Sequence, residues 1–187
     1  MRYFFIEPSS VTGPVVSIPG AEAHHIKNVL RLKPGAALLL FNGTEACDYR
    51  ALLIADGKKL CARIESAIAV HTESPLACEI IQGLGRGDHM DWMIQKTTEL
   101  GVSRIRLFNA ERTQSPLKRK QLEKKQQHWR GIAISACEQC GRALLPEIIF
   151  HADLNTAIAS TRAVERLLLE FEGQPLHSLL RLSLIHI

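Results

Sequence analysis

Hydrophobic and polar positions alternate in short runs over the first 72 residues, with glycine-containing turns between them. Asn42-Gly43 and Asp56-Gly57 lie between apolar runs, and both dipeptides supply the positive φ that tight hairpins require. The segment Ala21–Leu30 instead places apolar residues at helical spacing. We therefore expect residues 1–72 to form a small β-barrel that carries one helix. The pattern predicts its strands over Tyr3–Ile6, Val15–Ile18, Leu38–Phe41, Tyr49–Ala55 and Leu60–Ile68.

The pattern changes near residues 71–75, and from Leu76 onward strand-like runs alternate with longer helical runs. Such alternation is typical of a parallel sheet with crossover helices. Gly101 and Gly141 follow the two longer helical patterns and are expected to end them. The chain is thus expected to be an α/β protein with two domains, residues 1–72 and 73–187. The predicted strands of the second domain are Leu76–Ile81, Ile105–Asn109, Ile148–Phe150 and Leu167–Phe171, and its helices cover about 88–100, 117–140 and 154–160.

Composition places the chain among globular proteins. Of its 187 residues, 46% are hydrophobic and 22% charged, and no apolar run approaches the roughly 20 residues needed to span a bilayer. The amino terminus lacks the long apolar region of a signal peptide, so we expect a cytoplasmic protein whose five cysteines are free thiols. The net charge of +4 permits a polyanionic partner such as RNA without requiring one.

Two polar features follow predicted strands, at the end where α/β sheets place their binding groups. The first, Gly83-Leu84-Gly85-Arg86-Gly87, matches neither the dinucleotide-binding pattern nor a phosphate-binding loop. It is either a plain tight turn or a loop that presents Arg86 to an RNA phosphate. The second, Glu111-Arg112, is equally compatible with a surface ion pair and with a functional pair at the sheet edge.

The segment Cys137–Arg142 contains a C-x-x-C spacing, but it closes a predicted helix rather than opening one. A redox pair needs a helix amino terminus to stabilise its thiolate, and a zinc site would need a second ligand pair that the other cysteines do not provide. We therefore expect neither redox chemistry nor a metal site. Glu138, Gln139 and Arg142 gather polar groups at this helix end, and such side chains suit hydrogen bonds to a base edge and to a phosphate.

A basic run on the longest predicted helix is a further candidate for RNA contact. A solvated helix face is the usual explanation of such a run, and contact with a nucleic-acid backbone is the alternative. Its members are Lys118, Arg119, Lys120, Lys124 and Lys125.

Three stretches together resemble a known family. They are Gly85–Val102, Glu111–Thr113 and Ala133–Arg142, with QKTTELG inside the first and ACEQCGR inside the third. They resemble the bacterial 16S ribosomal RNA (uracil-N3)-methyltransferase family of the SPOUT superfamily. His25–Arg31 and Lys33–Gly35 are similar to that family's PUA-like barrel, and the resemblance runs over about residues 2–180.

The resemblance implies a PUA-like RNA-binding barrel followed by a SPOUT α/β domain whose C-terminal trefoil knot holds S-adenosylmethionine. It also implies methylation of N3 of a uridine in small-subunit ribosomal RNA, by a homodimer with its active site at the subunit interface. The N3 proton of uracil is weakly acidic, so a base or a cationic group should assist its removal. The residues expected to orient the uridine or stabilise its anion are Glu111, Arg112, Glu138, Gln139 and Arg142. Those expected to contact the RNA are Arg31, Arg86, Lys118, Arg119 and Lys124.

The sequence departs from this family at its carboxyl end. The family continues with a glycine-rich L-I-G-P-E-G-G segment and later an L-G-x-R-I-L-R-x-E-T-A segment, which build the knot, and neither is present. Leu169 and Glu170 lie where the first cofactor-facing loop begins, and Ser183–Ile187 does not match the family. We therefore expect a SPOUT domain truncated before its knot. Two hypotheses remain open: a methyltransferase that uses S-adenosylmethionine, and a catalytically inactive RNA-binding fragment.

Overall fold

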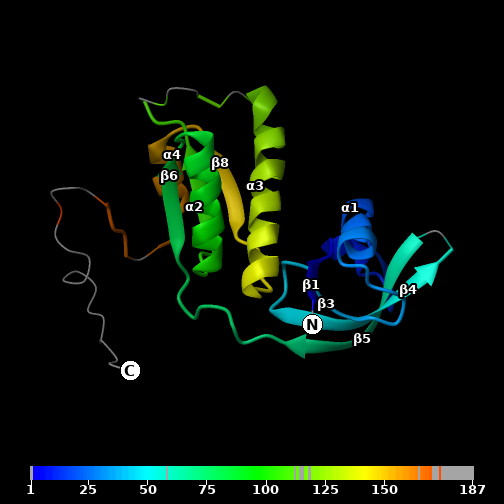
Figure 1. The fold of residues 1–187 in the computed structure, drawn as a ribbon. Helices are drawn as coiled ribbons and strands as arrows, with labels where there is room; N and C mark the ends of the chain where they lie inside the picture. The colour runs from blue at the N-terminus through cyan, green and yellow to red at the C-terminus, as the bar shows by residue number, and fades with distance from the viewer. Residues whose placement is uncertain are drawn as a thin grey trace.

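A computed structural model describes residues 2–57, 59–111, 113, 116–117, 119–163, 165–169 and 173. Two sheets lie side by side, one built from residues 2–69 and one from residues 79–151 (Figure 1). The predicted mixed α/β fold with a parallel sheet is confirmed. Arg112, Lys118 and Glu170 of the predicted site residues lie outside the described residues, as does the side chain of Arg119.

The first sheet has five strands in the order β1-β3-β4-β5-β2. β1 runs parallel to β3, and the other neighbours are antiparallel. All five predicted strands are present, with bounds that differ by at most two residues at either end. They are β1 (Arg2–Phe5), β2 (Val15–Ser17), β3 (Ala37–Phe41), β4 (Cys47–Asp56) and β5 (Lys59–Ala69).

Closure of the predicted barrel stays a prediction. In the part of the chain that the structure describes, β1 and β2 form the two edges of the sheet and do not pair with each other. The core lies on the sheet face covered by the helical segment, where Leu38, Leu40 and Leu53 are fully buried around Ile26. Burial of these side chains supplies the main favourable free energy for this half of the molecule.

The predicted helix Ala21–Leu30 is two structures in succession. A short α-helix, α1 (Gly20–His24), passes into a π-helical turn, η2 (His25–Val29), in which the Leu30 amide donates to the carbonyl of His25 at 3.0 Å. Arg31 then adopts a left-handed conformation with φ of 51°. Non-glycine residues rarely adopt this conformation, and π-helical turns gather at functional sites.

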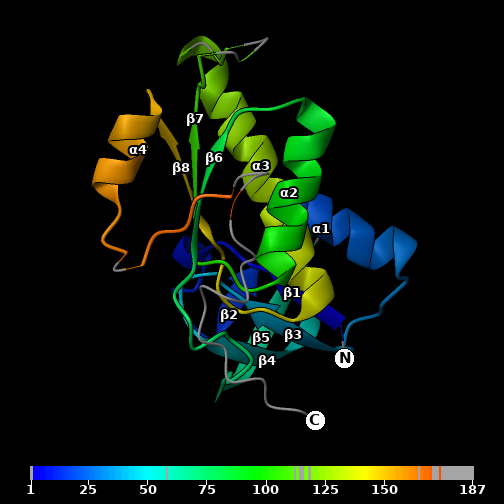
Figure 2. The ribbon, with the colours of Figure 1, turned by 90° about the vertical axis from the view of Figure 1, so that its left-hand side faces the viewer.

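The second sheet contains three parallel strands in the order β6-β7-β8. Figure 2 shows α2 and α3 on one face of this sheet and α4 on the other. Gly101 and Gly141 have φ of 93° and 80° where α2 and α3 end, as predicted. The elements are β6 (Glu79–Gly83), α2 (Gly87–Glu99), β7 (Arg104–Phe108), α3 (Arg119–Cys140), β8 (Glu147–His151) and α4 (Leu154–Ser160).

In this half, one predicted strand has the wrong bounds, and another is wrong for its described residues. β6 begins at Glu79 rather than at Leu76, whose side chain is exposed. Leu167–Leu169, the described part of the predicted strand Leu167–Phe171, forms no strand and is exposed. An apolar run becomes a strand only when an edge of a sheet pairs with it. Among the described residues the edges of β6 and β8 pair with no such segment.

The two halves join through a small apolar cluster and several hydrogen bonds. Phe5 and Phe41 from the first sheet pack with Cys137 and Ala143 at the end of α3. The Leu145 amide donates to the carbonyl of Gly43 at 2.9 Å. Since α3 runs past β1, this helix belongs both to the second sheet's core and to the junction (Figure 1).

Candidate functional site

The structure places Glu111 on the one hand, and Glu138 and Gln139 on the other, at opposite ends of the second sheet. Glu111 follows the carboxyl end of β7, whereas Glu138 and Gln139 lie in the last turn of α3, at the other end. The 22 residues of α3 separate these ends by about 33 Å at 1.5 Å per residue. One copy of the chain therefore does not bring Glu111 and Glu138 together.

The carboxyl end of the sheet is formed by the loops after β6 and β7. Arg86 is the N-cap residue of α2, and its exposed side chain lies 4.0 Å from the carboxylate of Asp88. Asn109 shapes the second loop, because its side chain accepts the Leu117 amide at 2.9 Å. Glu111 is exposed just beyond it. The loops thus leave Arg86 and Glu111 open to a large ligand.

Glu138 lies at the junction of the two halves. Its Oε1 accepts the backbone N–H of Phe5 at 3.0 Å. Burial raises the pKa of the Glu138 carboxyl above its usual value, and the hydrogen bond from Phe5 offsets part of that rise. Gln139 beside it is exposed. Glu138 is therefore held in place by the first sheet while remaining a stronger base than a solvated carboxylate.

Arg142, predicted to act on RNA, is buried and engaged within the protein. Its Nε donates to the carboxylate of Glu73 at 3.0 Å, and its Nη1 donates to the carbonyl of Thr98 at 2.6 Å. The second oxygen of Glu73 accepts the amides of Ala143 and Leu144, both at 3.0 Å. Sequence reasoning missed Glu73, which precedes Arg142 by 69 residues and carries no motif of its own. These bonds give Arg142 a role in holding α2, α3 and the connection between the sheets.

A groove of about 770 Å³ runs between the first sheet with its helical segment and the second half of α3. One wall comes from β1, α1 and η2, and the other comes from α3. The groove residues are Arg2, Tyr3, Phe4, Glu22, His25, Leu30, Gly131, Ile134, Ser135, Glu138 and Gln139. Two of the predicted catalytic residues, Glu138 and Gln139, thus line a common cavity with residues of the first sheet.

The predicted basic face lies on the amino-terminal half of α3. Lys120 and Lys124 are exposed and line a shallow groove of about 790 Å³ with Lys125 and His128. The ion pairs among the described residues include none with these three lysines. Arg31 is likewise exposed, on the first sheet's helical segment.

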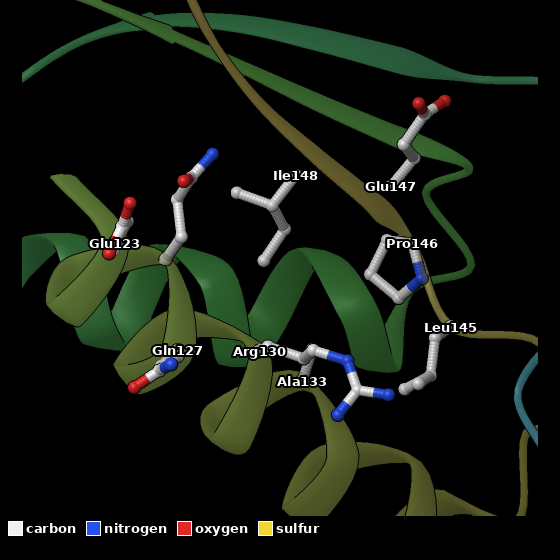
Figure 3. Close-up of a pocket in the computed structure, with 9 residues that line it drawn as sticks. Glu123, Gln127, Arg130, Ala133, Leu145, Pro146, Glu147 and Ile148 are labelled. Atoms are coloured by element: carbon white, nitrogen blue, oxygen red, sulfur yellow. The ribbon is translucent and has the colours of Figure 1, made fainter. Parts of the chain in front are cut away.

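A second pocket, of about 420 Å³, lies between α3 and the edge strand β8 (Figure 3). Ala133, Leu145 and Ile148 give it an apolar floor, and Arg130 stands at its rim. Arg130 is already bound to Glu7 of the first half through two bonds of 2.8 and 2.9 Å. None of the predicted site residues that the structure describes lines this pocket.

Cys137, the first cysteine of the C-x-x-C segment, has the environment of a structural rather than a redox thiol, whereas Cys140 is exposed. Cys137 is fully buried, and burial raises the pKa of its thiol to about 12. A reactive cysteine needs the opposite shift. Among the residues that the structure describes, no three His, Cys, Asp or Glu side chains gather as they would around a metal ion. No described helix is long and apolar enough to cross a membrane.

Of the two predicted cofactor-binding residues, only Leu169 is described. It follows Leu167 and Leu168 in an irregular segment, and the three side chains are 48%, 87% and 83% exposed.

Comparisons with known proteins agree with this arrangement. Residues 72–183 match the model of an RNA methyltransferase domain, and residues 18–65 match that of an RNA methyltransferase PUA domain. A curated relative, ribosomal RNA small subunit methyltransferase E of Bacillus subtilis, is 35% identical over 155 residues, which cover 80% of this chain and 59% of the relative. Its counterpart in Buchnera aphidicola (Schizaphis graminum) is 34% identical over 72% of this chain and 54% of its own length.

Two solved structures are similar over most of the chain. A methyltransferase from Legionella pneumophila, solved with bound S-adenosylmethionine, superposes with a TM-score of 0.79 and 30% identity, over 88% of this chain and 68% of that one. Ribosomal RNA small subunit methyltransferase E from Neisseria gonorrhoeae, bound to S-adenosylmethionine, gives a TM-score of 0.71 and 34% identity, over 80% and 62%.

The match and the fold define a protein in which a PUA domain is joined to an α/β domain with a parallel sheet. The chain belongs to the RNA methyltransferase family. It spans a little over half the length of the two curated relatives named above, 59% and 54%.

Proposed function

We propose that this chain is part of an enzyme that methylates N3 of a specific uridine in 16S ribosomal RNA of the small subunit, with S-adenosylmethionine as methyl donor. The observation that carries the proposal is the pair of matched domains, an RNA methyltransferase domain and its PUA domain, over residues 72–183 and 18–65. The relatives named as small-subunit methyltransferases and the two neighbours bound to S-adenosylmethionine support the RNA and the donor.

The chemistry assigns distinct tasks to the described residues. S-adenosylmethionine, when bound, supplies an electrophilic methyl group at its sulfonium. Attack on it requires that uracil N3 lose its proton, so a base must lie near N3. Glu138 is suited to this task, because burial raises its carboxyl pKa and the Phe5 amide fixes its orientation. Gln139 beside it can donate to and accept from the base edge.

Cationic groups are suited to hold the RNA backbone. Arg31 and Arg86 are exposed, and Lys120, Lys124 and Lys125 line one groove of α3. Phosphate contacts by Arg and Lys supply affinity and register without reading sequence. Arg142 is left out of this set, since its guanidinium is buried against Glu73 and the carbonyls of Thr98 and Val102.

A homodimer would bring residues from the two ends of the sheet together in one site. Glu111 and Glu138 are separated by the length of α3 within one chain. A second copy packed in the opposite sense would place the Glu111 end of one chain beside the Glu138 end of the other. We therefore include a site shared between two copies in the proposal.

The test combines donor binding with methyl transfer. We expect calorimetric titration with S-adenosylmethionine to give saturable micromolar binding, and the purified chain to label 16S ribosomal RNA from tritiated S-adenosylmethionine. A methyl group on N3 blocks Watson–Crick pairing, so primer extension on the labelled RNA should stop at one uridine. Labelling without such a stop would refute N3 as the acceptor atom.

The same titration distinguishes the proposed methyltransferase from the alternative, an inactive RNA-binding fragment. That hypothesis predicts retention of the RNA without a heat of binding for S-adenosylmethionine. Donor binding would exclude it, whereas RNA binding without donor binding would exclude catalysis by this chain alone.

A further inference from the structure

We propose that the groove between η2 and α3 binds one unpaired nucleotide of the RNA. The inference rests on the proposed RNA substrate and adds the site and the conformation of the RNA that it grips. Its cavity of about 770 Å³ lies within the size range of small-ligand sites.

The first support is the open edge of β1. The amide of Ile6 donates to Phe41 of β3 at 2.9 Å, whereas the amide of Phe5 points the other way and donates to Glu138 at 3.0 Å. Backbone groups alternate sides along a strand, so the N–H and C=O of Tyr3 face the same way as the Phe5 amide. Tyr3 lines the groove. This edge therefore offers a backbone donor and acceptor to a base.

The second support is the set of side chains on the facing wall. Ser135, Glu138 and Gln139 lie along α3 and reach the groove from the side opposite Tyr3. A hydroxyl, a carboxylate and an amide can together pair with the donors and acceptors of an exposed base edge. Watson–Crick edges are accessible only when the base is unpaired, because a duplex hides them in its base pairs and its major groove is too narrow for side chains to enter.

The third support is Gly131, in the middle of α3. Glycine destabilises a helix interior relative to alanine. Nothing in the described structure lies within 4 Å of a Cβ built at this position, so protein packing does not require glycine there. Gly131 lines the groove. Its missing side chain lets a ligand approach the helix backbone.

The fourth support is the conformation of the opposite wall. The π-helical turn η2 carries His25 into the groove, and Arg31 follows the turn with its φ of 51°. Strained backbone persists where the surrounding structure or a ligand requires it. Arg2 lies on the same wall, where its guanidinium is placed to hold a phosphate next to the bound base.

The test fills the groove by substitution at Gly131 and measures RNA binding. We would titrate a fluorescein-labelled 12-nucleotide oligouridine, and separately a blunt RNA duplex, by fluorescence anisotropy. Gly131→Ala and then Gly131→Leu should weaken oligouridine binding progressively, about tenfold or more for leucine, since contacts to a single base are worth that much. Thermal unfolding should show both variants at least as stable as the wild type, because both residues favour helix over glycine.

Gln127→Leu is the matched control, since Gln127 also lies on α3 but lines only the pocket beside β8 and a neighbouring groove of α3 that Gly131 also lines. Arg2→Gln tests the opposite wall and should also weaken binding. Equal affinities of the wild type and Gly131→Leu would overturn the site while leaving RNA binding intact. If Gln127→Leu and Gly131→Leu lost the same RNA affinity, the nucleotide would bind in the neighbouring groove and the proposed site would be wrong. Tighter binding of the duplex than of oligouridine would overturn the proposal that the bound nucleotide is unpaired. A wild-type chain that binds neither RNA nor S-adenosylmethionine would refute the proposed function itself.

Discussion

Arg142 and Glu73 form a buried ion pair of 3.0 Å, with their side chains only 8% and 15% exposed. Glu73 belongs to the connection between the two sheets, and Arg142 follows the glycine that ends α3. Because Arg142 also donates to the carbonyls of Thr98 and Val102 at the end of α2, the pair fixes three segments to one another.

Removal of the carboxylate should destabilise the protein strongly. Glu73→Ala would leave the Arg142 guanidinium buried without its counter-charge and the amides of Ala143 and Leu144 without an acceptor. Breaking a buried pair in this way costs about 3–5 kcal/mol of unfolding free energy. Urea denaturation measures the loss. Glu147→Ala serves as the control, because its pair with Arg104 is largely exposed and should contribute at most about 1 kcal/mol. Similar losses in the two variants would contradict a special role for Glu73.

Gly43 is the second position at which the junction constrains the sequence. Its φ is 77°, and a Cβ built there would lie 2.6 Å from Cδ1 of Leu145. Gly43→Ala should therefore strain the backbone and displace Leu145, with a loss of about 1–3 kcal/mol. Gly13→Ala is the matched control, since nothing lies within 4 Å of its Cβ position. Thermal unfolding of both variants checks this, and an unchanged Tm for Gly43→Ala would show that the junction adapts.

Local patterns in the sequence predict local structure well. Helix α4 has the predicted bounds Leu154–Ser160, because one N-cap and one short apolar pattern define it. The π-helical turn η2 is not predictable in this way, since a bond from Leu30 to His25 has no signature in spacing. The strand predicted over Leu167–Leu169 is wrong because β-propensity alone does not say whether a sheet edge will pair with a segment.

The candidate site is predictable in its residue types but not in its geometry. Motif matching groups Glu111 with Glu138, although α3 separates them. The contact of Glu138 with Phe5 spans 133 residues of sequence, and that of Arg142 with Glu73 spans 69. Such contacts depend on how the two sheets dock, which no local pattern encodes.

The lysines of α3 should set the salt dependence of RNA binding. Each phosphate contact releases counterions, so the logarithm of affinity falls with the logarithm of salt concentration by roughly 0.7 per contact for a single strand. Replacing Lys120, Lys124 and Lys125 together with glutamine should reduce that slope by about 2. Lys96→Gln is the control, since Lys96 already bonds to Glu99 at 2.8 Å. An unchanged slope in the triple variant would show that this face is only solvated.

The ionisation of Glu79, on the face of the second sheet that α4 covers, should make the free energy of unfolding depend on pH. Burial alone would raise its pKa, but hydrogen bonds from Arg104, Arg106 and Thr161 outweigh burial and lower the pKa to about 2. An unfolded glutamate has a pKa of about 4.3, so the folded protein keeps this carboxylate ionised at lower pH. Its contribution to stability is fully present above about pH 4.3 and is lost as the pH falls through about 2.

Glu79→Gln should therefore be less stable than the wild type at pH 6, and the difference should narrow between about pH 4 and pH 2. Urea denaturation of both proteins at about pH 6, 4 and 3 gives the comparison. Glu111→Gln, at an exposed position outside the arginine network, should track the wild type throughout. A difference for Glu79→Gln that stays constant with pH would mean that the substitution costs only packing and hydrogen bonds, and that the two arginines do not hold the charge of Glu79.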